Sequence, residues 1–271
     1  MKRLAQRANW LWRLVMTGLC FVLFGAGGLL LSLVWFNLLL LVQRDKTRRR
    51  RLARRSIAAS FRLFLHITRL LGVLDYRIDG IETLRNERGC LVVANHPTLI
   101  DYVLLASVMP ETDCIVKAAL LKNPFLAGVV RAADYLINSQ ADALLPACQQ
   151  RLAQGDTLLI FPEGTRTTPG EAMTLQRGAA NIAVRCGSDL RIVVIHCSEH
   201  LLDKHSRWYD VPPRKPMFTV GVRERVSITQ FYDATTQEPA LAARQLNRHL
   251  LHQLSPGFDS LSGINDASAH P

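Results

Sequence analysis

The chain begins with a long apolar segment and continues as short apolar runs that alternate with amphipathic stretches. Residues 14–42 contain no charged side chain, and this run of 29 residues is longer than the roughly 20 that a helix needs to cross a bilayer. After residue 74 the pattern changes, because short apolar runs recur between stretches with helical spacing. We therefore expect an N-terminal membrane-embedded helical segment followed by a domain of mixed helices and strands.

The second part of the chain is predicted to be an α/β domain with a largely parallel sheet flanked by helices. Strands are expected at residues 90–94, 114–117, 135–137, 157–161 and 191–196, with further strands at 218–222 and 225–228. Helices are expected at residues 99–108, 124–132, 141–154, 175–185 and 238–254. The apolar runs are mostly continuous, which is typical of strands covered on both faces. The predicted organisation is an anchor at residues 1–74, an α/β domain at 75–254 and a flexible tail at 255–271.

Two arrangements of the apolar segment fit its length. As one helix, residues 14–42 would extend about 43 Å, so a single span across a hydrocarbon core of roughly 30 Å must tilt. A bend at the glycine-rich residues 25–28 would instead give a helical hairpin that enters one leaflet. The run is too long for the core of a signal peptide and no cleavage site precedes the arginines, so we expect the segment to be retained.

The net charge of +11 belongs to the anchor. Residues 1–55 carry twelve basic side chains and one acid, whereas the remainder carries 21 of each and is neutral. Basic clusters beside an apolar run favour membrane lipids, not nucleic acid, as the partner. The positive-inside rule places the larger cluster and the following domain on the cytoplasmic side, which is the inner membrane if the source is a Gram-negative bacterium. The six cysteines show no paired spacing, which fits a reducing compartment.

The polybasic run continues into a predicted interfacial helix. Its basic side chains recur at spacings of four, seven, four and three residues and form one stripe, while apolar side chains occupy other faces. The stripe consists of Arg51, Arg55, Arg62, His66 and Arg69. The helix either contacts the membrane surface or packs on the domain as an ordinary amphipathic helix, and the polybasic run upstream favours membrane contact.

The clearest chemical signals are two short motifs about 60 residues apart. The first is Asn-His-Pro-Thr-Leu-Ile-Asp at residues 95–101, and it follows a predicted buried strand. His96 should therefore lie at the carboxyl edge of the sheet, where ligands bind in open α/β folds. A histidine there can accept a proton from a hydroxyl, and Asp101 can fix its tautomer and steady the imidazolium. A histidine and an aspartate five residues apart also occur by chance, and His96 would then only cap a strand end.

The second motif is Phe-Pro-Glu-Gly-Thr-Arg at residues 161–166, which also follows a predicted strand. The proline ends the strand, the glycine permits a sharp turn, and Arg166 offers a fork of donors suited to phosphate or carboxylate. Alternatively, the motif is a polar turn in which Glu163 and Arg166 pair with each other. Together, the two motifs indicate acyl transfer to an acceptor with a polar head group.

The order and spacing of these motifs resemble the glycerolipid acyltransferase family, which includes 1-acylglycerol-3-phosphate O-acyltransferases and other lysophospholipid acyltransferases. The resemblance covers roughly residues 75–200 and includes the segment around Lys117 and a Gln-Arg-Gly triplet at residues 176–178. It implies His96 as the base of the His-x4-Asp motif and Asp101 as its partner. It implies an acceptor-binding loop made of Phe161, Pro162, Glu163, Gly164, Thr165 and Arg166. Further substrate-binding residues would be Asn95, Lys117, Arg177 and Gly178.

The resemblance also implies a reaction. The protein would be a membrane-associated enzyme of phospholipid biosynthesis. It would move a fatty acyl group from acyl-CoA or acyl carrier protein to the hydroxyl of a lysophospholipid such as 1-acylglycerol 3-phosphate. We expect it to need no cofactor and no metal. We expect direct transfer, because there is no G-x-S-x-G elbow and no cysteine beside a partner motif. A metal site formed by His196, His200 and His205 is not expected, since their spacing matches no known ligand pattern.

Two departures from the family pattern concern the acceptor. The family usually has an arginine for the acceptor phosphate between the two motifs, and residues 133–139 contain none. Its fourth motif usually has a proline in an apolar strand, and residues 191–196 contain none. The alternatives are therefore an acyltransferase for an acceptor without phosphate, or a catalytically inactive protein of the same fold that binds lipids or acts as a scaffold.

Overall fold

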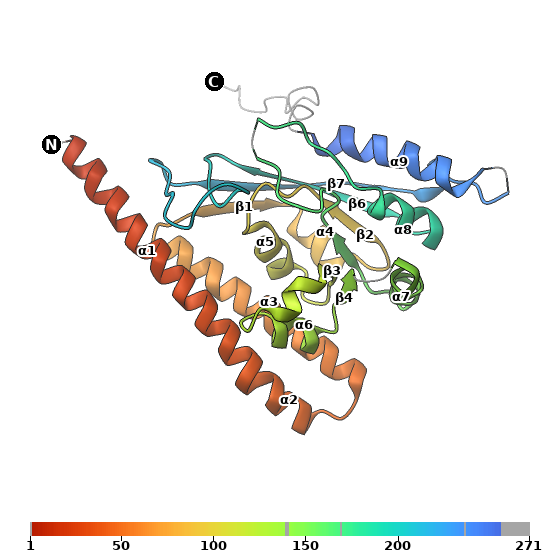
Figure 1. The fold of residues 1–271 in the computed structure, drawn as a ribbon, viewed down its shortest axis with the longest axis horizontal. Coiled ribbons are helices and arrows are strands. Elements are labelled where there is room, and N and C mark those ends of the chain that lie inside the picture. Colours follow the sequence, from red (N-terminus) through yellow and green to blue (C-terminus); the bar gives the residue numbers. More distant parts are fainter. Residues whose placement is uncertain (1, 139–140, 169, 236, 256–271) are drawn as a thin grey trace, which may run out of the picture.

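The computed structural model describes residues 2–138, 141–168, 170–235 and 237–255. Except for Ser255, the tail predicted at residues 255–271 lies outside the described residues. The described residues form a central sheet, helices on both of its faces, and a long helical hairpin along one side (Figure 1).

The sheet has seven strands in the order β1-β7-β6-β2-β5-β3-β4. The strands are β1 (Asp75–Asp79), β2 (Leu91–Ala94), β3 (Asp113–Lys117), β4 (Leu136–Asn138), β5 (Leu158–Ile160), β6 (Leu190–Cys197) and β7 (Met217–Val226). All neighbouring strands run parallel except β6 and β7. The predicted α/β fold with a largely parallel sheet is therefore confirmed. The strands predicted at residues 218–222 and 225–228 are replaced by the single strand β7, which ends at Val226, and β1 was not predicted.

Alternate residues of the central strands enter different parts of the core. Leu91 and Val93 of β2 pack toward one face of the sheet. That face is covered by α7 (Ala141–Ala153), α8 (Gly178–Cys186) and α9 (Pro239–Leu254). Val92 and Ala94 pack toward the opposite face. The opposite face is covered by α3 (Lys46–Leu70), α4 (Ile81–Asn86), α5 (Asp101–Val108) and α6 (Ala127–Ala133). Because both faces are covered, β2 must be apolar at every position.

The apolar N-terminal segment is one long helix. It consists of α1 (Lys2–Leu30), a π-helical turn (Leu31–Trp35) and α2 (Phe36–Val42). The chain turns at residues 43–45, and α3 returns beside this helix (Figure 1). By length and composition this is the one helix among the described residues that could cross a membrane.

The glycine-rich residues 25–28 do not bend the helix. A Cβ atom on Gly28 would lie 2.9 Å from the backbone oxygen of Phe125, and one on Gly25 would lie 3.6 Å from the ring of Phe125. These glycines therefore allow the loop before α6 to approach the helix closely. The hairpin expected as one alternative within residues 14–42 is therefore not formed. The hairpin in the structure turns later, at residues 43–45, and its second arm is α3.

The predicted basic stripe lies on the exposed face of α3, and all five of its members are exposed. The apolar face of α3 packs into the domain, where Ile57 and Leu65 are fully buried. The interpretation of α3 as an amphipathic helix packed on the domain therefore describes its apolar side. Its basic side is exposed, and at its margin Arg55 and Arg69 pair with Glu111 and Asp75 of the domain.

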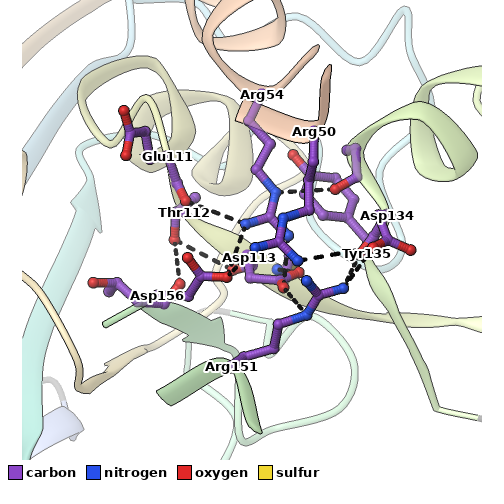
Figure 2. A network of polar contacts seen from close by, with 12 residues as sticks. Arg50, Arg54, Glu111, Thr112, Asp113, Asp134, Tyr135, Arg151 and Asp156 are labelled. Atoms are coloured by element: carbon purple, nitrogen blue, oxygen red, sulfur yellow. Dashed lines mark hydrogen bonds and ion pairs between the residues drawn. The ribbon is translucent and has the colours of Figure 1, made fainter. Parts of the chain in front are cut away.

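Part of the polybasic run is buried against the domain (Figure 2). The Arg54 guanidinium forms an ion pair with Asp113 (Nη2 to Oδ2, 2.6 Å) and donates from Nε to the carbonyl of Ala133. Arg50 pairs with Asp156 at 3.0 Å, and Arg151 of α7 approaches Asp113 at 3.4 Å. The Arg54 and Asp113 side chains are 2% and 0% exposed. Arg50 and Arg54 therefore attach α3 to the domain and are not available to a membrane.

The N-terminal part of α1 is also attached to the domain. The Trp10 indole donates to the carbonyl of Val211, and the buried Arg13 donates to the carbonyls of Pro213 and Arg214. The proline-rich loop at residues 211–216 therefore holds one end of the long helix, while the loop before α6 contacts its middle.

Candidate active site

His96 lies just after β2, at the carboxyl edge of the sheet. The preceding Asn95 is buried, and its side chain exchanges two hydrogen bonds with the backbone of Ile195 in β6. Asn95 therefore continues the pairing of β2 with β6 beyond the end of the strand. Its contacts are with the sheet, and it does not line the cavity described below.

His96 and Asp101 form the contact that their spacing predicts. Nδ1 of His96 lies 2.9 Å from Oδ2 of Asp101, which is fully buried at the start of α5. Asp101 also accepts hydrogen bonds from the Thr98 amide at 2.7 Å and the Thr98 hydroxyl at 2.6 Å. Burial raises the pKa of Asp101, and the bonds from His96 and Thr98 act against this rise. Because Asp101 accepts at Nδ1, the hydrogen of a neutral imidazole lies there and Nε2 can accept a proton.

The second motif packs directly on the first. The ring of Phe161, just after β5, stacks on the imidazole of His96 with 4.4 Å between ring centroids and 27° between planes. Gly164 has φ of +69°, a left-handed conformation that favours glycine, and its amide closes a turn onto the Phe161 carbonyl. The two motifs therefore meet at neighbouring strand ends.

Glu163 joins the two motifs through the backbone. Its carboxylate is 4% exposed, accepts from the His96 amide at 2.6 Å and accepts from the Thr167 hydroxyl. The Thr167 amide in turn donates to the His96 carbonyl at 3.1 Å. Burial raises the pKa of Glu163 to about 7. Glu163 does not line the cavity, so these contacts fit a positioning role for it better than the predicted acceptor binding.

Arg166 does not pair with Glu163. Its Nη1 atom donates to the carbonyls of Leu202 and Asp203, each at 2.8 Å. These bonds hold the half-buried guanidinium at the edge of the cavity. The alternative of a self-paired polar turn is therefore not the conformation of this loop.

A cavity of about 870 Å³ opens beside His96 and Phe161. Its volume lies within the range of sites that bind small organic molecules. Most of its lining is apolar, and the long helix and α3 contribute a wall that includes Phe24, Phe61 and Phe64. From the second motif, Phe161, Pro162, Gly164, Thr165 and Arg166 line it.

The other predicted substrate-binding residues differ in position. Lys117 is exposed at the end of β3, lines the cavity and lies opposite Asn138 in the sheet register. Gly178 lines the cavity at the start of α8, whereas the exposed Arg177 beside it does not. Among the described residues, no group of three or more His, Cys, Asp or Glu side chains could hold a metal ion.

Sequence reasoning missed several residues of the site. Thr98 and Thr167 complete the hydrogen bonds of Asp101 and Glu163, and both lie within or next to the motifs. Phe24, Phe61 and Phe64 lie far away in sequence, and their apolar character was assigned to the membrane segment or to faces of the predicted interfacial helix. Only their packing over the sheet edge shows that they belong to the cavity.

Comparison with known proteins gives consistent matches. Residues 75–198 match the family model described as Acyltransferase. A 1-acyl-sn-glycerol-3-phosphate acyltransferase from Helicobacter pylori is 27% identical over 173 residues, which cover 60% of this chain and 69% of that protein. Another from Pseudomonas aeruginosa is 26% identical over 133 residues, which cover 46% of this chain and 51% of that protein. The aligned region thus spans between about half and two thirds of these relatives.

The fold also matches a solved structure. The crystal structure of the 1-acyl-sn-glycerophosphate acyltransferase PlsC from Thermotoga maritima superposes with a TM-score of 0.66. The match covers 96% of this chain and 98% of that chain, with 21% sequence identity. At this identity the likeness concerns the fold, including the helical hairpin, and says nothing about the substrate.

Proposed function

Because the chain belongs to the glycerolipid acyltransferase family and is an O-acyltransferase, we propose that it transfers a fatty acyl group from a thioester to the hydroxyl of 1-acylglycerol 3-phosphate. The observation that carries this proposal is the pair of half-buried His96 and fully buried Asp101 at an apolar cavity that Lys117 and Arg166 also line. The cavity suits acyl chains, and the two cations suit an anionic head group.

In the proposed mechanism, Nε2 of His96 accepts the proton of the acceptor hydroxyl as the hydroxyl oxygen attacks the thioester carbonyl. Asp101 stabilises the resulting imidazolium through Nδ1. The carbon–oxygen bond forms, the carbon–sulfur bond breaks, and the departing thiolate takes the proton from His96. The thiolate belongs to coenzyme A or to the prosthetic group of acyl carrier protein.

Exchanging His96 for alanine tests the base. General-base catalysis contributes typically 10²–10⁴ in rate, so His96→Ala should lower kcat by about that factor. The matched control is His66→Ala, because His66 is exposed on α3 and outside the cavity. Turnover of a folded His96→Ala protein at the rate of the control would reject the mechanism.

We infer that Lys117 binds the acceptor phosphate in place of the missing arginine. Asn138 ends β4 within the stretch where the family has that arginine, and Lys117 lies opposite it in the sheet. Lys117 has no ion-pair partner among the described residues, which leaves its ammonium available to a phosphate. Arg166 lines the same cavity and is held by two backbone carbonyls through Nη1, so its other nitrogens remain available to the same head group.

The test compares acceptors with and without phosphate. Lys117→Ala should raise the KM for 1-acylglycerol 3-phosphate about tenfold and leave the KM for acyl-CoA unchanged. Lys122→Ala is the control, because Lys122 is an exposed lysine at the end of the short 3-10 helix that follows Lys117, and it does not line the cavity. Equal use of monoacylglycerol by the wild-type protein, with no effect of Lys117→Ala, would favour an acceptor without phosphate.

We also propose that the hairpin lies in one leaflet on the cytoplasmic side. The long helix exposes many large apolar side chains, such as Val22 and Leu41, the second of which is 80% exposed. The domain contacts this helix near its start through Trp10 and again around Gly28, so the helix cannot cross the bilayer while the domain stays in water. The exposed stripe of α3 would then meet anionic head groups.

Vesicle flotation tests the membrane proposal. A protein with Arg51, Arg55 and Arg62 changed to glutamine should bind anionic vesicles about 100-fold less tightly, at roughly 1 kcal/mol for each cation near the surface. Binding to neutral vesicles should change little. A loss of equal size on both kinds of vesicle would contradict the assignment of this stripe to the head groups.

A further inference from the structure

The apolar cavity contains a pair of tyrosine hydroxyls. Tyr102 lies on α5, one residue after Asp101, and Tyr135 directly precedes β4. Both side chains line the cavity, and the Tyr102 hydroxyl donates to the Tyr135 hydroxyl over 2.7 Å. The two residues come from different elements and place polar atoms in an otherwise apolar part of the cavity wall.

One hydroxyl hydrogen of this pair is unused. Two hydroxyls carry two hydrogens, and the bond between them consumes only the hydrogen of Tyr102. The Tyr135 hydrogen has no acceptor among the residues that the structure describes. Tyr135 is only 8% exposed, so its contact with bulk water is small. Burial raises the pKa of both tyrosines above the usual value, so both keep their hydrogens at physiological pH.

The other neighbours of the pair among the described residues accept no hydrogen bond from Tyr135; the Cys114 thiol, which interacts with both tyrosines, is only a weak acceptor. The Arg54 guanidinium lies 5.8 Å from the centre of the Tyr135 ring and has only donors (Figure 2). The ring of Phe61 meets Tyr102 edge to face at 5.9 Å, and the buried Val130 lines the same cavity. A buried donor without an acceptor is unfavourable, and a ligand that brings an acceptor removes this cost.

We propose that this cavity selects acyl donors whose chain carries a hydrogen-bond-accepting oxygen, such as a keto, ether or hydroxyl oxygen, which accepts the free hydrogen of Tyr135. The inference rests on the proposed function, and it adds that the acyl chain in the cavity beside His96 is that of the donor. A plain hydrocarbon chain leaves the Tyr135 donor unpaired, whereas an oxygen at the matching chain position pairs it. The tyrosine pair is thus a specificity determinant on the acyl side of the reaction.

A competition experiment with the full chain in detergent micelles tests this proposal. The protein receives plain 1-acylglycerol 3-phosphate and an equimolar mixture of a saturated acyl-CoA and acyl-CoAs of equal length with one keto oxygen at different positions. Mass spectrometry gives the product ratio. We expect a three- to tenfold preference for one oxygen position, which is the effect of one net hydrogen bond. The reverse arm, with the oxygen on the acceptor chain and a plain donor, should show no preference.

Tyrosine variants test whether the Tyr135 hydroxyl causes the preference for an oxygenated donor. Tyr102→Phe should keep it, because Tyr135 retains its free hydrogen. Tyr102→Phe/Tyr135→Phe should reduce the ratio to about one while plain chains are still transferred. Tyr209→Phe, an exposed tyrosine outside the cavity, should behave as wild type. A purely structural tyrosine pair would alter transfer of both donors equally and leave the ratio unchanged.

Two results would overturn the proposal: a wild-type ratio of about one at every oxygen position, or an unchanged ratio in the double variant. Displacement of a fluorescent fatty acid from His96→Ala protein by plain and oxygenated fatty acids gives a second readout without catalysis, and the oxygenated acid should displace three- to tenfold better. If oxygenated acids displace the fluorescent fatty acid better but the wild-type protein transfers no acyl group, the proposed function is rejected and the selectivity of the cavity is kept. Transfer without preference in either assay would reject the selectivity alone.

Discussion

Changing Asp101 to asparagine removes a charge from the proposed active site with almost no change of shape. Oδ2 of Asp101 accepts from His96 Nδ1 and from the Thr98 amide, while Oδ1 accepts from the Thr98 hydroxyl. An asparagine oxygen at the Oδ2 position keeps the first two bonds. The Thr98 hydroxyl can then rotate and accept from the asparagine amide. The variant should therefore fold and keep the hydrogen of His96 on Nδ1.

The lost charge sets the size of the effect. Nδ1 and Oδ2 are 2.9 Å apart, and Asp101 is fully buried. For charge centres about 4 Å apart and an effective dielectric constant of about 20, the attraction between imidazolium and carboxylate is about 4 kcal/mol. One factor of ten in rate corresponds to about 1.4 kcal/mol, which sets an upper limit near 10³-fold. We expect kcat of Asp101→Asn to fall by about 10²–10³, with both KM values nearly unchanged.

The assay follows release of coenzyme A, with the product identified by mass spectrometry. Asp79→Asn is the matched control, because Asp79 is exposed and pairs only with the nearby Arg77 among the described residues. Thermal unfolding in the same detergent shows whether each variant is folded. A folded Asp101→Asn protein within threefold of the wild-type rate, or an equal loss in Asp79→Asn, would refute the proposed role of the His96–Asp101 pair.

Three further predictions concern stability. Burial raises the pKa of Glu163 to about 7, so the folded protein keeps a proton that the unfolded chain releases near pH 4.5. The free energy of unfolding should therefore fall by up to about 3 kcal/mol as the pH rises from 4.5 through 7. Calorimetry should show a flatter dependence of stability on pH for Glu163→Gln. Arg54→Met should cost about 3–5 kcal/mol in denaturant unfolding because it leaves a buried carboxylate poorly paired, whereas the exposed Arg51→Met should cost under about 0.5 kcal/mol. Gly28→Ala should lower the free energy of unfolding by about 1–3 kcal/mol, because its Cβ would meet a backbone carbonyl. Gly27→Ala, whose Cβ meets nothing within 4 Å, should be neutral or slightly stabilising.

The parallel α/β fold was predictable because strands covered on both faces need apolar residues at every position. β2 is such a strand, and its residues are all fully buried. β1 was missed because Asp75–Asp79 is an edge strand with alternating exposure and charged residues, and such a segment has the composition of a loop. The site could be placed at strand ends for the same reason, since each motif follows an apolar strand.

The chemical roles were harder to predict because they depend on which atoms a side chain meets. Glu163 looked like a ligand-binding residue, but its carboxylate binds the His96 amide. Arg50 and Arg54 looked like part of a membrane-facing run, but they pair with the carboxylates of Asp156 and Asp113 in the domain. Charge and spacing show that a residue is polar, and only the fold shows whether its partner is lipid, substrate or backbone.

The predicted boundary at residue 74 separates two segments that share one cavity. Phe24 of the long helix stacks on Phe61 of α3 at 6.1 Å, and both line the space beside His96. In the proposed leaflet-bound arrangement, the helix that contacts lipid acyl chains on its outer face therefore contacts the acyl chain of the substrate on its inner face. A chain can then reach His96 from the bilayer without its apolar surface entering water, which is unfavourable at about 25 cal/mol for each Å² exposed. The N-terminal hairpin is accordingly one wall of the site as well as its attachment to the membrane.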